Sequence, residues 1–170
     1  EFPNPMMYYR KDAFENPEAQ SRYQTQFGKP LEVPTTWEDF MNIAEFFTGW
    51  DWAGSGKSGY GFQTSTWDRG FIEQQWAPTM GSYGGVWMDD NASPGWNNAA
   101  GVAALEGLKR LVNSAPPGSA SMSWPQTGES FQSDDIALTL WYMDQGRYGG
   151  DWLDKIGYAP WPCATVDGVY

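Results

Sequence analysis

Residues 34–48 read PTTWEDFMNIAEFFT, and this stretch carries the clearest structural signal in the chain. Thr35 is followed three residues later by Glu38, a spacing typical of the capping box at the start of a helix. Large apolar side chains then recur at intervals of three and four residues, which places them on one helical face. They are Trp37, Phe40, Met41, Ala44 and Phe47. The stretch therefore predicts an amphipathic helix over residues 36–48.

The rest of the chain alternates helical patterns with short apolar runs. Residues 136–141, IALTLW, predict a buried central strand. Shorter strands are expected at residues 6–9, 59–62 and 156–160. Further helices are expected within 16–28, over 68–80, from Asn97 or Asn98 to about 112, from Ser123 to about Gln132, and briefly at 152–156. This alternation indicates the α/β class.

Two local details complete this interpretation. Arg10-Lys11-Asp12 is predicted to form a charged turn. The helix that follows Asn97 or Asn98 has as its apolar residues Val102, Leu105, Leu108, Leu111 and Val112. Its leucines are expected to be core or cap residues.

The composition excludes several classes of function. The 170 residues include 11 Trp, 9 Tyr and 9 Phe, and 41% of the chain is hydrophobic, which indicates one globular domain. A net charge of −11 argues against partners such as nucleic acid or an anionic membrane surface. Cys163 is the only cysteine and histidine is absent, which excludes intrachain disulfides and His-based catalysis. No apolar run approaches the roughly 20 residues of a membrane helix, so we expect no direct membrane insertion.

Four segments in sequence order resemble the family of extracellular solute-binding proteins that includes the maltose-binding protein. YYRKDAF at 8–14 is similar to the family's tyrosine-rich strand and the turn after it, and PTTWEDF at 34–40 is close to its PPTTWDEF helix start. The helix and stop at 103–118 and the segment FQSDDIALTLW at 131–141 match in order and spacing. Ser133-Asp134 departs from the family pattern, which has Gly-Lys there.

This resemblance implies the fold and the domain organisation. It implies a helix-rich α/β lobe of the type II periplasmic-binding-protein fold, with a small buried sheet. Residues 1–170 would form one domain, the second lobe of a two-lobe protein, with residues 1–9 and 160–170 as hinge or crossover segments. Because the chain begins with Glu1 and is about half the length of a full member, we expect it to be a piece of a longer protein that also has a first lobe.

The resemblance also implies a function. Such a protein is the substrate-binding component of an ABC importer, and it captures a sugar or oligosaccharide between its two lobes. Its expected partners are the small-molecule carbohydrate, the missing first lobe and the membrane subunits of the transporter. We expect it to be exported to the periplasm or the cell exterior. No enzymatic activity, catalytic residue, metal or cofactor is expected.

Sugars present flat C–H faces and a rim of hydroxyls, so their sites combine aromatic rings with polar side chains and backbone groups. Three stretches of the sequence contain this mixture. They are Trp67, Asp68 and Arg69; Tyr83, Gly84 and Gly85; and Trp141, Tyr142 and Asp144. The last group follows the predicted central strand, where the resembling family places a stacking aromatic. A Trp at a strand end is also common in cores, and Gly84-Gly85 also suits a simple turn.

Two other classes of protein remain open from the residues alone. A glycoside hydrolase fragment would use two carboxylates, would show a Trp-rich cleft and would need no histidine. A carbohydrate-binding module is disfavoured, since such modules are usually β-sandwiches and this chain has capped amphipathic helices. The ligand stays undetermined among mono- and oligosaccharides, polyols, sugar phosphates and compatible solutes. Arg69 leaves room for an anionic sugar.

Overall fold

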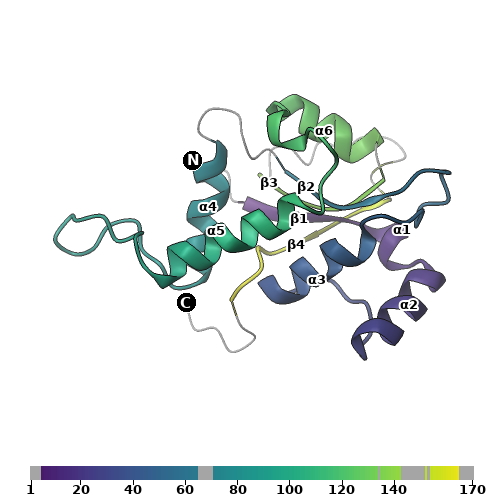
Figure 1. Ribbon diagram of the computed structural model, residues 1–170, viewed down its shortest axis with the longest axis horizontal. Helices are drawn as coiled ribbons and strands as arrows, with labels where there is room; N and C mark the ends of the chain where they lie inside the picture. Colours follow the sequence, from purple (N-terminus) through teal and green to yellow (C-terminus); the bar gives the residue numbers. More distant parts are fainter. Residues whose placement is uncertain (1–4, 65–70, 134, 143–151, 153, 165–170) are drawn as a thin grey trace.

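The computed structural model describes residues 5–64, 71–133, 135–142, 152 and 154–164 of the chain. Most strands and helices lie close to the predicted positions (Figure 1). The short helix expected at 152–156 is not formed as predicted, because residues 154–155 form a turn and Ile156 begins β4. The strands are β1 (Pro5–Arg10), β2 (Tyr60–Gln63), β3 (Ile136–Tyr142) and β4 (Ile156–Ala159). The helices are α1 (Lys11–Phe14), α2 (Pro17–Phe27), α3 (Trp37–Phe47), α4 (Phe71–Ser82), α5 (Ala99–Val112) and α6 (Trp124–Ser133), with a short 3₁₀ turn, η1 (Ser119–Ser121). Within these ranges, no helix has the length and apolarity to cross a bilayer.

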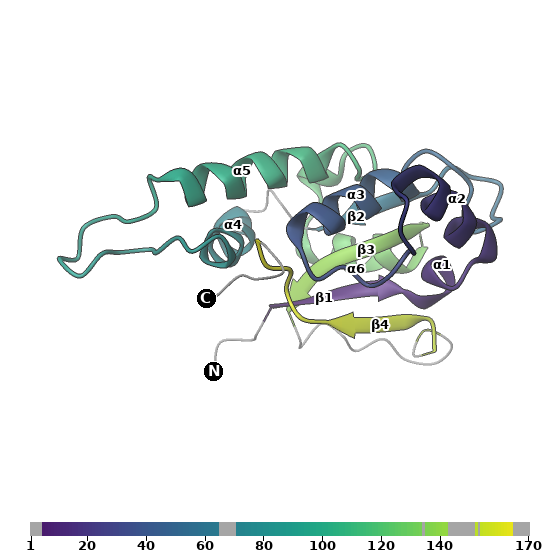
Figure 2. The same cartoon turned by 90° about the horizontal axis from the view of Figure 1, so that it is seen from below.

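The four strands form one sheet in the order β2-β3-β1-β4. β3 is an interior strand, as the apolar run of residues 136–141 predicts, and it pairs parallel with β2 and antiparallel with β1. β1 also pairs antiparallel with β4, with Met7 opposite Ala159. β1 therefore starts, and β4 ends, on the same side of the sheet (Figure 2).

Two hydrophobic clusters lie on the two faces of this sheet, because successive residues of a strand point to opposite faces. Met7 belongs to the larger cluster, which includes Trp37 and Phe40 of α3. The next residue, Tyr8, belongs to a second cluster with Phe131 of α6. The sheet is thus covered by α3 on one face and by α6 on the other, and Figure 1 shows these helices on opposite sides of the strands.

The start of α3 differs by one residue from the predicted capping box. The cap is Thr36, whose side-chain oxygen accepts a hydrogen bond from the Asp39 backbone N–H at 3.2 Å. Thr35 is not the cap because the segment after β4 pairs with the backbone here. Cys163 donates its N–H to the Thr35 carbonyl at 2.9 Å, and Trp37 donates to the Cys163 carbonyl at 2.8 Å. A tertiary contact therefore decides which threonine caps the helix.

Two further predictions are wrong in detail. Residues 11–14 form the short helix α1 instead of a charged turn, and the Lys11 N–H is held by the carbonyl of Lys155 at 2.8 Å. In α5, Leu105 is 50% exposed, in contrast to the prediction for the leucines, and Val102 is 52% exposed. The buried face of α5 carries smaller residues, together with two of the predicted leucines. It consists of Gly101, Ala104, Gly107, Leu108 and Leu111.

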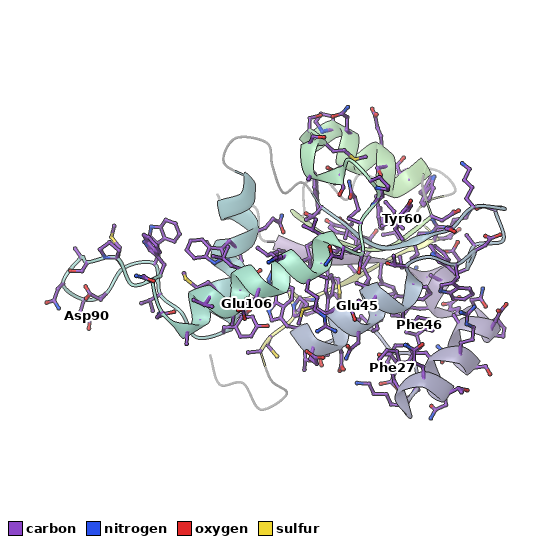
Figure 3. All side chains as sticks on the ribbon, in the orientation of Figure 1. Phe27, Glu45, Phe46, Tyr60, Asp90 and Glu106 are labelled. Carbon is purple, nitrogen blue, oxygen red and sulfur yellow. The ribbon has the colours of Figure 1, made fainter. Side chains whose placement is uncertain are left out.

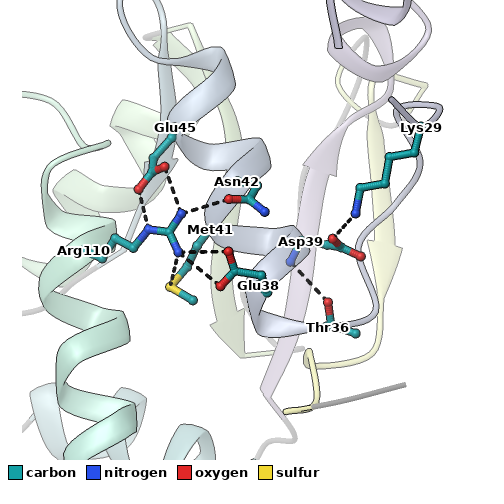
Figure 4. A network of polar contacts seen from close by, with 8 residues as sticks. All are labelled: Lys29, Thr36, Glu38, Asp39, Met41, Asn42, Glu45 and Arg110. Atoms are coloured by element: carbon teal, nitrogen blue, oxygen red, sulfur yellow. Dashed lines mark hydrogen bonds and ion pairs between the residues drawn. The ribbon is translucent and has the colours of Figure 1, made fainter. Parts of the chain in front are cut away.

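α5 is tied to α3 by one arginine (Figure 4). The Arg110 guanidinium donates to both oxygens of the Glu45 carboxylate and, at 2.9 Å, to the side-chain oxygen of Asn42. Arg110 also pairs with Glu38 at 3.3 Å. Its hydrogen bonds hold the pKa of Glu45 below its ordinary value. The pair fixes α5 beside the helix that covers the sheet.

Candidate functional site

Four strands of the sheet begin or end at the same end of the sheet. β2 and β3 are parallel, so their carboxyl ends lie side by side, with Gln63 opposite Thr139. β1 begins at this end, where Pro5 pairs with Tyr142. β4 finishes there, opposite Met7. We call this end of the strands the sheet end. Carboxyl ends of neighbouring strands are a common place for ligand sites in open α/β sheets.

The structure brings Trp141 and Tyr142 to the sheet end. Trp141 is 5% exposed and belongs to the cluster that contains Tyr8 and Phe131 on the α6 face. Its ring is therefore packed into the lobe and is not an open stacking platform in this conformation. Tyr142 is the last residue of β3. Asp144, together with Trp67, Asp68 and Arg69 after β2, lies outside the described residues.

Tyr83 lies beside the start of α3, and Gly84 and Gly85 follow it in the chain. The Tyr83 ring stacks on Trp37 with an interplanar angle of 15° and a centroid distance of 6.5 Å, and burial raises the pKa of Tyr83 above its ordinary value. Trp37 also contacts Trp161, which follows β4. Gly84 has φ +79°, so this position does require glycine for a turn. Trp37 therefore connects Tyr83 with the segment that leaves the sheet end after β4.

Three buried polar residues at the sheet end were missed by the sequence interpretation. Gln63, Thr64 and Thr139 are at most 2% exposed. The Thr64 hydroxyl donates to the Leu140 carbonyl at 2.9 Å, which links the ends of β2 and β3. The side-chain oxygens of Gln63 and Thr139 have no hydrogen-bond partner within the described part of the chain. Thr139 was visible in the sequence only as a polar residue inside an apolar run.

This combination suits recognition of a neutral, hydroxyl-rich ligand. Buried amide and hydroxyl oxygens are costly unless they receive hydrogen bonds from water or a ligand. Aromatic residues beside them supply apolar surface. Among the described residues, no three His, Cys, Asp or Glu side chains are grouped so that they could hold a metal ion.

A separate cavity lies on the outer side of the lobe, between α2 and α3. Its volume is about 170 Å³, and its lining includes Tyr23, Lys29 and Asp39, but no residue of the sheet. The Tyr23 hydroxyl has no partner among the described residues. Burial, together with the nearby Asp39 charge, raises the pKa of Tyr23 to about 12. None of the residues predicted to bind ligand lines this cavity.

Solved structures show where this fold occurs. An ABC transporter solute-binding protein from Agrobacterium radiobacter K84, in complex with ribitol, is 25% identical and has a TM-score of 0.71. One from Agrobacterium vitis S4, with bound D-mannitol, is 20% identical with a TM-score of 0.70. A sugar transporter structure from Arthrobacter chlorophenolicus A6, with bound laminaribiose, is 20% identical with a TM-score of 0.69.

These alignments define which part of a relative the chain represents. Each covers 95% of this chain but only 37% or 38% of the solved chain. The chain therefore spans less than two fifths of the length of these proteins, and its fold is that of one lobe of the type II periplasmic binding fold.

No curated protein sequence matches the chain. The sequence model of one family, described as bacterial extracellular solute-binding protein, matches residues 2–164. By this match over nearly its whole length, the chain belongs to the bacterial extracellular solute-binding protein family.

Proposed function

We propose that the chain is one lobe of the substrate-binding component of an ABC importer, and that the complete protein captures a sugar or polyol between two lobes. The sheet end is the observation that carries this proposal. Aromatic residues and two buried side-chain oxygens, those of Gln63 and Thr139, gather there, next to the points where the chain enters and leaves the lobe. Neither oxygen has a hydrogen-bond partner among the described residues. Relatives of the same fold have been solved with ribitol, D-mannitol and laminaribiose. The family membership does not support the alternative of a glycoside hydrolase.

In this proposal, residues 1–170 are the second lobe, and residues 1–9 and 160–170 cross toward the first. Two features support this division. β1 and β4 are adjacent antiparallel strands, so the chain arrives and departs at one edge. Residues 161–164 are fastened to the lobe from outside the sheet, through Cys163 to the start of α3 and through the Ala164 N–H to the Ser82 carbonyl. Segments held in this way are suited to a hinge between rigid bodies.

The partners follow from the same proposal. The ligand would sit against the sheet end and be covered by the first lobe. The complete protein would then deliver its ligand to the membrane subunits of the importer, in the periplasm or at the cell exterior. The family itself is extracellular.

Trp141 and Tyr142 have different roles in the proposed site. Trp141 is packed beneath the sheet end, so it would support the ligand surface and contact the ligand only at its exposed edge. Tyr142, the last residue of β3, would contribute more directly. Asp144 follows the carboxyl end of β3 in the chain, and Trp67, Asp68 and Arg69 follow that of β2. Together with Tyr83, Gly84 and Gly85, they complete the proposed set.

Nuclear magnetic resonance titration of the ¹⁵N-labelled chain tests the site. Ribitol, mannitol, laminaribiose and maltose are added separately to millimolar concentrations. We expect at least one ligand to shift the amide signals of Gln63 and Thr64 and the indole signal of Trp141. Replacing Tyr142→Ala should reduce these shifts at equal ligand concentration, because it removes ligand contact area.

Phe27→Ala is the matched control, since Phe27 is a partly buried aromatic residue of α2 and packs against the other hydrophobic cluster, not the one that contains Trp141. It should leave the shifts at the sheet end in place. The proposal fails if none of the four ligands shifts these signals, or if the shifts gather at the cavity between α2 and α3.

A further inference from the structure

Exposed apolar side chains are concentrated on one projection of the lobe. Residues 84–97, between α4 and α5, form a hairpin that extends away from the sheet (Figure 1). Seven large apolar side chains are exposed in the described part of the chain, and four belong to this hairpin. They are Val86 at 51%, Trp87 at 49%, Met88 at 56% and Trp96 at 41%. Clustered exposure of this kind marks an interaction surface.

The hairpin has an ordered backbone. Gly95 donates to the Trp87 carbonyl at 3.0 Å, and Asp89 donates to the Ser93 carbonyl at 2.9 Å. The Asp89 carboxylate accepts from the backbone N–H groups of Asn91 and Ser93 at 2.9 Å each. Gly95 packs so closely on Val86 that a Cβ there would come within 2.6 Å of its side chain.

The two exposed tryptophans are held by a third. Trp76 of α4 meets Trp87 edge-on at a centroid distance of 5.8 Å, and it meets Trp96 edge-on at 6.0 Å. Trp76 is itself fixed, because its indole N–H donates to the Gly101 carbonyl at 3.0 Å. Two half-exposed indoles are therefore presented by a rigid support. Pre-organised aromatic surface binds ligands with little loss of side-chain entropy.

The charges around the hairpin restrict what can bind there. Residues 70–108 contain no Lys or Arg, and their acidic residues are Glu73, Asp89, Asp90 and Glu106. Figure 3 shows Asp90 at the far end of the hairpin and Glu106 on α5. An anionic partner would be repelled by these carboxylates. A second copy of this chain, docked through the same surface about a two-fold axis, would bring acidic rims together.

A neutral polyhydroxyl ligand fits the same surface without this conflict. Its C–H faces can lie on the indoles, and its hydroxyls can donate to carboxylates and exchange hydrogen bonds with amides. Asp90, Asn91 and Asn97 are exposed next to the tryptophans in the sequence. We propose that Trp87 and Trp96 form a second carbohydrate-binding platform, separate from the sheet end, which holds an oligosaccharide or polysaccharide chain. This proposal depends on the proposed function only for the choice of carbohydrate as the class of ligand.

Affinity electrophoresis tests this platform with the chain as it is. The protein is strongly acidic, so it migrates readily in native gels. The gels contain laminarin, soluble starch or xylan as the probe, and a gel without polysaccharide gives the reference mobility. We expect retardation in at least one of them. Trp87→Ala or Trp96→Ala should weaken the apparent binding by about tenfold, and the double variant should migrate at the reference mobility.

Leu105→Ala is the matched control, because Leu105 is an equally exposed apolar residue on α5, outside the hairpin. It should be retarded like the wild type. Circular dichroism confirms that the variants are folded. If the protein is not retarded in any of the gels, the proposal is overturned. The occupant of the hairpin surface would then be a protein surface with a basic rim or another part of the complete protein. Retardation that persists in the double variant also overturns it.

The two proposals fail independently of one another. The hairpin variants should keep the magnetic resonance shifts that small ligands cause at the sheet end. Tyr142→Ala should keep the retardation in polysaccharide gels. A chain that is retarded in gels but shows no shift at Gln63, Thr64 or Trp141 would keep the platform and lose the sheet-end site.

Discussion

Gly61 shows how closely α3 lies on the sheet. A Cβ at this position would come within 1.7 Å of the Ala44 backbone carbonyl, an atom that cannot move without displacing the helix. We therefore expect Gly61→Ala to reduce the free energy of unfolding by about 3 kcal/mol or more, measured by urea denaturation. Gly128→Ala in α6 is the control, because a Cβ there has open space. It should raise stability by about 0.5–1 kcal/mol through better helix propensity. Equal effects at the two positions would contradict this packing.

The residues of the candidate site were only partly accessible to sequence reasoning. Aromatic residues beside polar ones drew attention to Trp141 and Tyr142, and both lie at the sheet end. The sequence does not show whether a tryptophan at a strand end faces a ligand or the core, and Trp141 packs into the core. Gln63 and Thr139 escaped notice because each is an ordinary polar residue until the parallel pairing of β2 with β3 places them together. That pairing is a long-range property.

At the scale of elements, helix boundaries were predictable because caps and apolar periods are local signals. Asn98 caps α5 and accepts from the Gly101 N–H at 3.0 Å, as the sequence indicates. At the start of α6, the Ser123 N–H donates to the Gln126 side chain at 2.8 Å, which is one of the two hydrogen bonds of a capping box. The errors at Thr35 and Leu105 have a common cause. In both, contacts with distant segments decide what the local pattern leaves open.

The Arg110 pair with Glu45 gives a testable tie between α3 and α5. Arg110→Met keeps much of the side-chain length but removes the charge, and we expect it to lower the free energy of unfolding by about 0.5–1 kcal/mol. The effect is small because both partners are substantially exposed to solvent. Glu45→Gln in the Arg110→Met background should cost little more, since the interaction is already lost. Urea denaturation of the wild type, Arg110→Met, Glu45→Gln and the double variant measures the coupling between the two residues. Strictly additive losses of stability would contradict it.

The same pair makes a prediction about pH. The pKa of Glu45 is lowered in the folded protein by its hydrogen bonds to Arg110. A carboxylate with a depressed folded pKa contributes its full stability above its unfolded pKa, which is near 4.5, and loses it as the pH falls further. The stability difference between the wild type and Arg110→Met should therefore be constant at neutral pH and shrink below about pH 4.5. If this stability difference grew on acidification, the ion pair of Arg110 with Glu45 would not be its source.

For the whole molecule, the proposed function implies that this lobe presents only one side of a binding site. The chain covers 38% of a solved relative, and the candidate site lies at one end of its sheet. Stacking one face of a sugar ring removes about 100 Å² of apolar surface from water, worth roughly 2–3 kcal/mol. Micromolar affinity requires about 8 kcal/mol beyond the cost of ordering the ligand. One surface does not supply that amount.

We therefore expect the isolated chain to bind mannitol, ribitol, laminaribiose or maltose with a dissociation constant in the millimolar range or weaker. A second lobe that closes over the ligand would supply the remaining contacts and remove water from the hydrogen bonds at the sheet end. Isothermal titration calorimetry measures the affinity, and low-affinity titrations at high ligand concentration extend its range. Micromolar binding of any of these ligands by this chain alone would mean that the lobe already encloses its ligand, and the two-lobe proposal would then lose its physical basis.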